Sequence, residues 1–415
     1  KVRQMSLLDC AAVIEDGRVS AKAVDEVIGK LSIGCLQDPR AEAHLSAEAV
    51  NAVQRHLVES TRLGIPGLVI SECLHGHMSG GTTVFPQAIG LGSTWNVELI
   101  QRMASAIAKE ARAVGAAQAL GPDLDLARDP RWGRVEETYG EDPCLTSRLG
   151  VAYIKGMQGE GTFVDREHLV CTPKHFAAHG SPEAGINLAP VAGGIRDLRT
   201  IYLPAFEAAI CEAGALSIMP AYREHEGVPA SASKLLLTRI LRQEWGFTGY
   251  VFADYGAVQM LHTFHRTARD AAEAGRQALA AGMDLEAPSD YGFGEQLLAM
   301  VQSGAVPVGL VDRAVARILR VKFLAGLFEN PYADTERIDK VVGCPAHRKL
   351  AREAAQEAIV LLRNEGNLLP LPPNLKRIAV IGPNADEVQL GDYTLVGTEA
   401  VTVLQGIRNA VDKRT

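Results

Sequence analysis

The run Tyr250-Val251-Phe252-Ala253-Asp254, in which apolar residues lead directly to a carboxylate, decides the fold. Similar short apolar runs occur at residues 67–71, 119–126, 169–173, 215–222 and 282–285. Their continuous rather than alternating hydrophobicity is typical of strands in a parallel sheet that is covered on both faces. Longer amphipathic stretches lie between them, at residues 97–114, 197–213, 233–244 and 267–281. Strand and helix alternate, so the sequence predicts an α/β fold and most simply a (β/α)₈-like TIM barrel over residues 1–330.

The pattern changes near residue 327. Residues 331–345 are polar, begin and end with a proline, and are predicted to be a linker. A helix predicted over residues 348–362 and a new apolar run at 377–381 follow. Residues 346–415 are therefore predicted to be the N-terminal part of a second α/β domain. Because about seventy residues are few for an independent core, we expect this domain to be cut short.

The composition excludes several classes of protein. The 415 residues are 47% hydrophobic and 22% charged, which is typical of a globular protein and not of a disordered one. The net charge is −7 and no basic block occurs, so we expect neither a nucleic acid nor a membrane as a partner. The seven cysteines form no CxxC pair and no HExxH motif is present, so the sequence predicts no metal site.

Polar side chains gather at the ends of the apolar runs. In a barrel, reactive groups lie where the strands end and the following loops begin. Because those ends meet on one face, we expect these side chains to form a single polar rim. Asp123 and Asp125, at the end of the run at residues 119–126, belong to this rim. The candidate site residues within it are Glu72, Arg134, Lys174, His175, Tyr222 and Asp254.

Two interpretations are open for Asp254. An aspartate directly before a predicted helix is a good N-cap. The alternative is a nucleophilic carboxylate, which needs a fixed position and neighbouring hydrogen-bond donors.

The cations of the rim are open to more than one interpretation as well. Lys174 and His175 could bind the hydroxyl groups of a neutral sugar, or form a structural ion pair. A desolvated barrel lysine also suits Schiff-base chemistry, as in an aldolase. Arg134 could belong to a surface salt-bridge network with Glu136 and Glu137.

Several motifs together resemble glycoside hydrolase family 3, the family of β-glucosidases, β-xylosidases and their relatives. These motifs are Lys174-His175-Phe176-Ala177-Ala178-His179-Gly180, Asp129-Pro130-Arg131-Trp132-Gly133-Arg134-Val135-Glu136, Gly140-Glu141-Asp142-Pro143 and Phe252-Ala253-Asp254-Tyr255. The resemblance runs from about residue 63 to the C-terminus. It implies a (β/α)₈-like barrel followed by an α/β sandwich domain, and a retaining, exo-acting β-glycosidase for terminal glucose or xylose on an oligosaccharide or β-glycoside.

The resemblance also implies roles for the candidate residues. Asp254 matches the nucleophile that forms a covalent glycosyl-enzyme, for which no cofactor is needed. Glu72 matches a position that is Asp in many members of the family. The residues implied to hold the sugar in subsite −1 are Glu72, Arg134, Lys174, His175 and Tyr222.

The family's N-acetylglucosaminidase branch uses a histidine as acid/base where this sequence has Asn187, so that branch is disfavoured. Other branches use a glutamate of the second domain, which we expect beyond Thr415. Glu387 and Glu399 match no motif. Two alternatives stay open: a sugar-binding homologue without catalysis, and a Schiff-base aldolase that uses Lys174.

Overall fold

The largest sheet in the described part of the chain is parallel. The computed structural model describes all residues except 31, 289, 373–374, 396–397, 399 and 413–415. The strand order is β1-β4-β5-β6-β7, formed by β1 (Leu7–Asp9), β4 (Cys35–Gln37), β5 (Leu68–Ser71), β6 (Gln118–Ala119) and β7 (Val170–Cys171). In the register of the first three strands, Leu36 lies between Leu8 and Val69. Every residue of β5 is buried, which explains the continuous hydrophobicity of its sequence.

Parallel contacts continue beyond this sheet. β8 (Ser217–Ile218) pairs with β11 (Tyr250–Val251), and single bridges join Phe176 to Pro220 and Phe252 to Leu285. The backbone N–H of Glu286 then donates to the carbonyl of Met5, just before β1 (3.1 Å). The α/β class with a parallel sheet is therefore confirmed, whereas the closed barrel stays a prediction.

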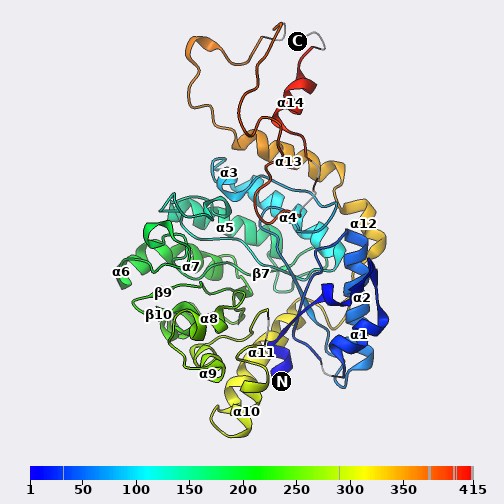
Figure 1. Cartoon of the computed structure of the whole chain (residues 1–415), viewed down its shortest axis with the longest axis vertical. Helices are drawn as coiled ribbons and strands as arrows, with labels where there is room; N and C mark the ends of the chain where they lie inside the picture. Colours follow the sequence, from blue (N-terminus) through cyan, green and yellow to red (C-terminus); the bar gives the residue numbers. More distant parts are fainter. Residues whose placement is uncertain (31, 289, 373–374, 396–397, 399, 413–415) are drawn as a thin grey trace.

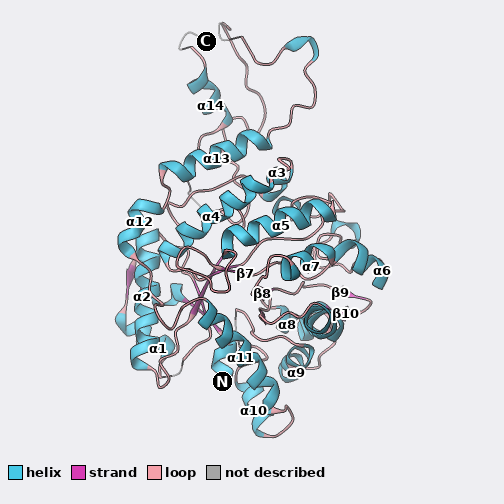
Figure 2. Ribbon diagram, turned by 180° about the vertical axis from the view of Figure 1, so that it is seen from behind, coloured by secondary structure: helices cyan, strands magenta, loops and turns pink. Residues whose placement is uncertain are grey.

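Helices surround these strands (Figure 2). The α-helices are α1 (Ala21–Ile28), α2 (Ala43–Ser60), α3 (Ala88–Gly92), α4 (Val97–Val114), α5 (Pro143–Gln158), α6 (Ile195–Asp197), α7 (Pro204–Cys211), α8 (Ala257–Thr263), α9 (Ala271–Ala281), α10 (Glu295–Gln302), α11 (Val308–Leu324), α12 (Thr335–Val341), α13 (Pro345–Ala358) and α14 (Val403–Ala410). Helix α4 spans the stretch that its periodicity predicts, because Leu99, Met103 and Ile107 recur on one buried face. None of the described helices is long and apolar enough to cross a membrane.

Two predicted helices differ from the structure. The stretch predicted at 197–213 contains α6, a π-helical segment (Leu198–Tyr202) and α7, which begins at Pro204. Proline suits a first helical turn but cannot donate a hydrogen bond to the turn before it. The stretch predicted at 233–244 is π-helical over Leu235–Glu244.

The region predicted as a linker contains a helix that packs on the rest of the chain. Ile338 of α12 is only 2% exposed and lies in one apolar cluster with Ala47 of α2 and Val114 of α4. Glu110 of α4 holds the turn that follows α12. Its carboxylate accepts a hydrogen bond from the Gly343 N–H (3.1 Å) and contacts His347 Nδ1 (2.6 Å).

After α13 the chain extends away from the helices at one end of the molecule (orange to red in Figure 1). The predicted strand at 377–381 pairs with no other strand in the described part of the chain. Ile381 at its end is 90% exposed, so nothing covers the side chain that a strand would bury. The prediction of a strand here is therefore wrong for this structure.

Helices α4 and α5 approach closely at a glycine, and this contact yields a stability prediction. A Cβ at Gly156 would lie 2.2 Å from the carbonyl oxygen of Gln101. We expect Gly156→Ala to lower the free energy of unfolding by about 1–3 kcal/mol, because the helices must separate. Gly309 of α11 is the matched control: a Cβ there meets only Arg313 Nη1 at 3.7 Å, so Gly309→Ala should not destabilise. Urea unfolding of both variants measures this, and equal midpoints would contradict the close contact.

Candidate active site

Asp254 directly follows β11, and the neighbouring strand supplies its first hydrogen-bond donor. Tyr222 follows β8, and its hydroxyl donates to Asp254 Oδ1 at 2.7 Å. The backbone N–H of Tyr255 donates to the same oxygen at 2.7 Å. Oδ2 accepts no hydrogen bond from the described residues and lies 3.6 Å from His175 Nε2. One oxygen of this carboxylate is therefore fixed while the other faces the site.

The interpretation of Asp254 as a helix cap is wrong. The N-cap of α8 is Gly256, and no side chain caps this helix. Burial raises the pKa of Asp254 to about 6, although the hydrogen bond from Tyr222 and the charge of Arg134 act in the opposite direction. Asp254 is therefore an anion above about pH 6.

Lys174 and Glu72 form a buried ion pair across two strand ends. Lys174 Nζ lies 3.0 Å from Glu72 Oε2, and the two side chains are 2% and 8% exposed. Burial favours the neutral amine, but the carboxylates of Glu72 and Glu137 and the neighbouring Tyr393 together act in the opposite direction, and the pKa of Lys174 is raised overall. The amine is therefore a cation, which binds hydroxyl groups well but is not the nucleophile that a Schiff base requires.

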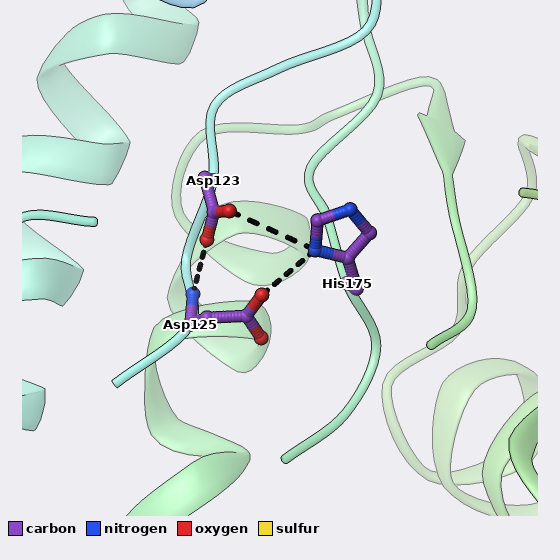
Figure 3. A group of neighbouring side chains, drawn as sticks. All are labelled: Asp123, Asp125 and His175. Carbon is purple, nitrogen blue, oxygen red and sulfur yellow. Dashed lines mark hydrogen bonds and ion pairs between the residues drawn. The ribbon is translucent and has the colours of Figure 1, made fainter. Parts of the chain in front are cut away.

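His175 is oriented by Asp123 and Asp125, two residues of the predicted polar rim that were not among the candidate site residues (Figure 3). Its Nδ1 lies 2.7 Å from Asp125 Oδ2 and 3.7 Å from Asp123 Oδ2. Burial first, and then the charge of Arg134, hold the pKa of His175 well below its usual range. The ring is thus neutral, so Nδ1–H donates to Asp125 and the lone pair of Nε2 faces Arg134 and Asp254.

The same three side chains are a group that could hold a metal ion. However, burial raises the pKa of both Asp123 and Asp125, so these carboxyl groups hold a proton more readily than exposed aspartates do. The Nδ1 atom that would ligate a metal is already bound to Asp125, and the guanidinium of Arg134 contacts the other ring nitrogen. The charge balance at this position therefore favours a proton over a cation.

Arg134 connects the remaining candidates. Its guanidinium forms a two-point ion pair with Glu137 (2.6 and 2.8 Å) and contacts His175 Nε2 (3.1 Å) and His179 Nε2 (3.0 Å). The side chain of Arg134 is 18% exposed and that of Glu137 is 2% exposed. The expected salt bridge is thus present, but it is buried rather than on the surface.

The six candidate residues therefore lie in one connected set. Asp254 contacts Tyr222 and His175, His175 contacts Arg134, and Lys174 precedes His175 and pairs with Glu72. Their roles toward a saccharide stay predictions. Five neighbours of this set were not among the candidate site residues: Asp123, Asp125, Glu137, His179 and Tyr393. Asp123 and Asp125 lie at the end of an apolar run, Glu137 was expected only as a surface partner of Arg134, and His179 lies inside a quoted motif, so a signal was available for all of them except Tyr393. Of the two glutamates without a motif, Glu387 is exposed and Glu399 lies outside the described residues.

Comparison with known protein families agrees with these motifs. Residues 1–321 match the model of the "Glycosyl hydrolase family 3 N terminal domain", and residues 359–415 match the "Glycosyl hydrolase family 3 C-terminal domain". The chain belongs to glycosyl hydrolase family 3.

Similar family 3 proteins carry two kinds of name. A "Beta-xylosidase" of Formosa agariphila is 41% identical over 383 residues, which are 84% of this chain and 52% of that protein. A "Periplasmic beta-glucosidase" of Salmonella typhimurium is 35% identical over 399 residues, which are 94% of this chain and 50% of that protein. The chain therefore spans about half the length of these relatives.

Solved structures agree with the fold. A β-glucosidase from Erythrobacter marinus superposes with a TM-score of 0.94 at 37% identity, over 98% of this chain and 54% of that one. A β-glucosidase from Listeria innocua in complex with glucose gives a TM-score of 0.89 at 34% identity, over 99% of this chain and 57% of that one.

The hydrogen bond from Tyr222 predicts how Asp254 titrates in this family 3 chain. The bond stabilises the anion, so Tyr222→Phe should raise the pKa of Asp254 above its value of about 6. A hydrogen bond to a charged group is typically worth about 1.5–3 kcal/mol. The measurement is a ¹³C NMR titration of the aspartate carboxyl carbons, with Asp254→Asn to assign the signal.

Tyr255→Phe is the control for this titration. In this variant the backbone N–H of residue 255 still donates to Asp254. The hydroxyl that the substitution removes donates to Gln37 and not to Asp254. The titration midpoint of Asp254 should therefore stay in place. An unchanged or lower midpoint in Tyr222→Phe would show that Tyr222 does not set this pKa.

Proposed function

We propose that this chain carries the saccharide site of a retaining, exo-acting β-glycosidase that removes terminal β-linked glucose or xylose, with Asp254 as the nucleophile. The observation that carries the proposal is the environment of Asp254. Two donors hold Oδ1, while Oδ2 accepts no hydrogen bond from the described residues and faces the neutral ring of His175. A fixed carboxylate with one free oxygen is suited to attack a carbon atom that approaches from the site.

In the proposed reaction, Oδ2 of Asp254 forms a bond to the anomeric carbon while the bond to the leaving oxygen breaks. Water then attacks the same carbon while the bond to Oδ2 breaks, so Asp254 is restored as a carboxylate and the product keeps the original anomeric configuration. An acid/base group gives a proton to the leaving oxygen in the first step and takes one from the water in the second. Positive charge develops on the sugar ring in the transition state of each step. Hydrogen bonds to its hydroxyl groups strengthen at that point, and the residues proposed to make them are Glu72, Arg134, Lys174, His175 and Tyr222.

We further propose that residues 1–330 form a (β/α)₈-like barrel, with residues 346–415 as the first part of an α/β sandwich domain. The parallel contacts that lead from β1 through the sheet, β8 and β11 back to Met5 support the barrel. The match of residues 359–415 to the family's C-terminal domain supports the second unit. Residues 331–345 link the two and include α12.

The relatives support glucose and xylose as the two sugars to test. Those named above are called β-xylosidase and β-glucosidase, and the Listeria innocua enzyme has been solved with glucose and, as a mutant, with laminaribiose. The charged state of Lys174 disfavours the aldolase alternative, because Schiff-base formation starts from a neutral amine.

The proposal predicts that Asp254 can be trapped as a glycosyl ester. 2,4-Dinitrophenyl 2-deoxy-2-fluoro-β-glucoside and β-xyloside lose a leaving group that needs no proton donor, so the first step depends on the nucleophile. We expect the chain to release dinitrophenolate once and to gain the mass of one fluorosugar, located on Asp254 by peptide mass spectrometry. Asp254→Asn should slow this release by roughly a thousandfold or more.

Asp312→Asn is the matched control, because Asp312 is exposed on α11 and, among the described residues, its ion pair is with Lys1 at the surface. This variant should label as fast as the unchanged chain. Labelling at full rate in Asp254→Asn, or a label on another residue, would refute the nucleophile. Tight binding of the fluorosugar without release of dinitrophenolate would instead identify a sugar-binding protein.

A further inference from the structure

Residues 390–394, here called the C-terminal strap, return from the C-terminal segment to the strand ends that carry the site. Three side chains from the N-terminal part hold the strap by its backbone. Gln87 at the start of α3 donates to the carbonyl oxygens of Leu390 (3.1 Å) and Asp392 (3.0 Å). Glu136 accepts from the Asp392 N–H (3.0 Å), and His75 Nε2 lies 2.8 Å from the Asp392 carbonyl oxygen. Contacts at successive backbone groups define one position for the strap rather than a loose contact.

The strap places one aromatic side chain against the candidate saccharide ligands. The ring of Tyr393 lies over Lys174, with Nζ 4.6 Å from its centroid. Arg134 Nη2 donates to Tyr393 Oη at 3.3 Å. Tyr393 is thus in contact with two cations that come from different strand ends.

The phenol of Tyr393 keeps its proton. The charge of Lys174 lowers the pKa of Tyr393, but burial and the carboxylate of Glu72 outweigh it and raise this pKa to about 12. Because Oη already accepts a hydrogen bond from Arg134, its own hydrogen can point toward a saccharide oxygen. The ring offers an apolar face of the kind on which sugars stack.

Access to Lys174 involves this residue. Lys174 and His175 are 2% and 1% exposed, while Tyr393 above Lys174 is half-buried. A sugar hydroxyl that reaches the ammonium must therefore pass beside, or replace, the ring of Tyr393. The contacts from Gln87, Glu136 and His75 go to the backbone of the strap, so they leave the side chain of Tyr393 directed at Lys174 and Arg134.

We propose that Tyr393 is a saccharide-contacting residue that completes the site from the C-terminal segment. Its hydroxyl binds the terminal sugar together with Arg134, and its ring holds the Lys174 ammonium toward that sugar. This inference rests on the proposed function, because it assigns a further ligand to the same saccharide.

The test is calorimetric binding of isofagomine, the ligand solved with the Listeria innocua β-glucosidase, to the unchanged chain and its variants. Tyr393→Ala should weaken binding roughly tenfold, because it removes both the cation–π contact and the hydroxyl. Tyr393→Phe keeps the ring and should weaken binding roughly threefold. Gln87→Ala loosens the strap without touching the site, so its effect should be smaller than that of Tyr393→Ala. Tyr332→Ala, a change just before α12, should bind as the unchanged chain does.

Thermal unfolding of the same samples separates a saccharide contact from a structural role. A lower midpoint in Tyr393→Ala with unchanged affinity, while Lys174→Ala loses binding, would overturn this inference and leave the proposed function standing. If Tyr393→Ala does not fold, the same comparison of unfolding midpoint and isofagomine affinity is made with Tyr393→Phe. Absence of isofagomine binding by the unchanged chain, together with absence of labelling by either fluorosugar, would overturn the proposed function and this inference with it.

Discussion

The site depends on charges that are buried and must therefore neutralise one another. The ammonium of Lys174 is almost fully buried, and its transfer from water would cost several kcal/mol without a partner. Glu72, 3.0 Å away on another strand end, supplies the opposite charge. Arg134 and Glu137 repeat this arrangement with two contacts. Glu72 and Lys174 come from different strand ends, so their pair holds these two segments in register, whereas Arg134 and Glu137 pair within one short turn. These side chains are thus fixed before any ligand is present, and preorganised donors are what would stabilise developing charge in the proposed reaction.

The sequence predicted the parts of the fold whose pattern is long or strongly apolar. Helix α4 and strand β5 follow the predicted ranges closely, because each buries a continuous face or all of its side chains. Strands β1 and β4 were missed, since three residues are too few to show a period. The strand expected at 377–381 has a suitable composition but no described partner, and composition alone does not form a sheet.

The candidate site could be predicted as a set, but not its internal partners. Strand ends converge in a parallel sheet, so polar residues that follow apolar runs are brought together regardless of loop geometry. The sequence does not show which glutamate pairs with Arg134, because the pairing depends on the short 3₁₀ turn at Val135–Glu137. That turn buries Glu137 beside the guanidinium and points Glu136 toward the strap, where it accepts from the Asp392 N–H. Adjacent, identical residues thus take different roles, and no pattern in the sequence distinguishes them.

Tyr393 is the contact of the site that is hardest to predict from the sequence. Nothing in its own neighbourhood indicates a saccharide site, and its partners lie far away along the chain. Its φ of +58° is in the left-handed region, which costs a side chain such as tyrosine about 1–2 kcal/mol. The bonds from Gln87 and Glu136 to the strap backbone offset this cost only when the strap lies on the N-terminal part. The conformation that aims the ring at Lys174 is thus stabilised by the docked state itself. Burial of the ammonium and docking of the strap therefore reinforce each other, since each supplies a contact that the other needs.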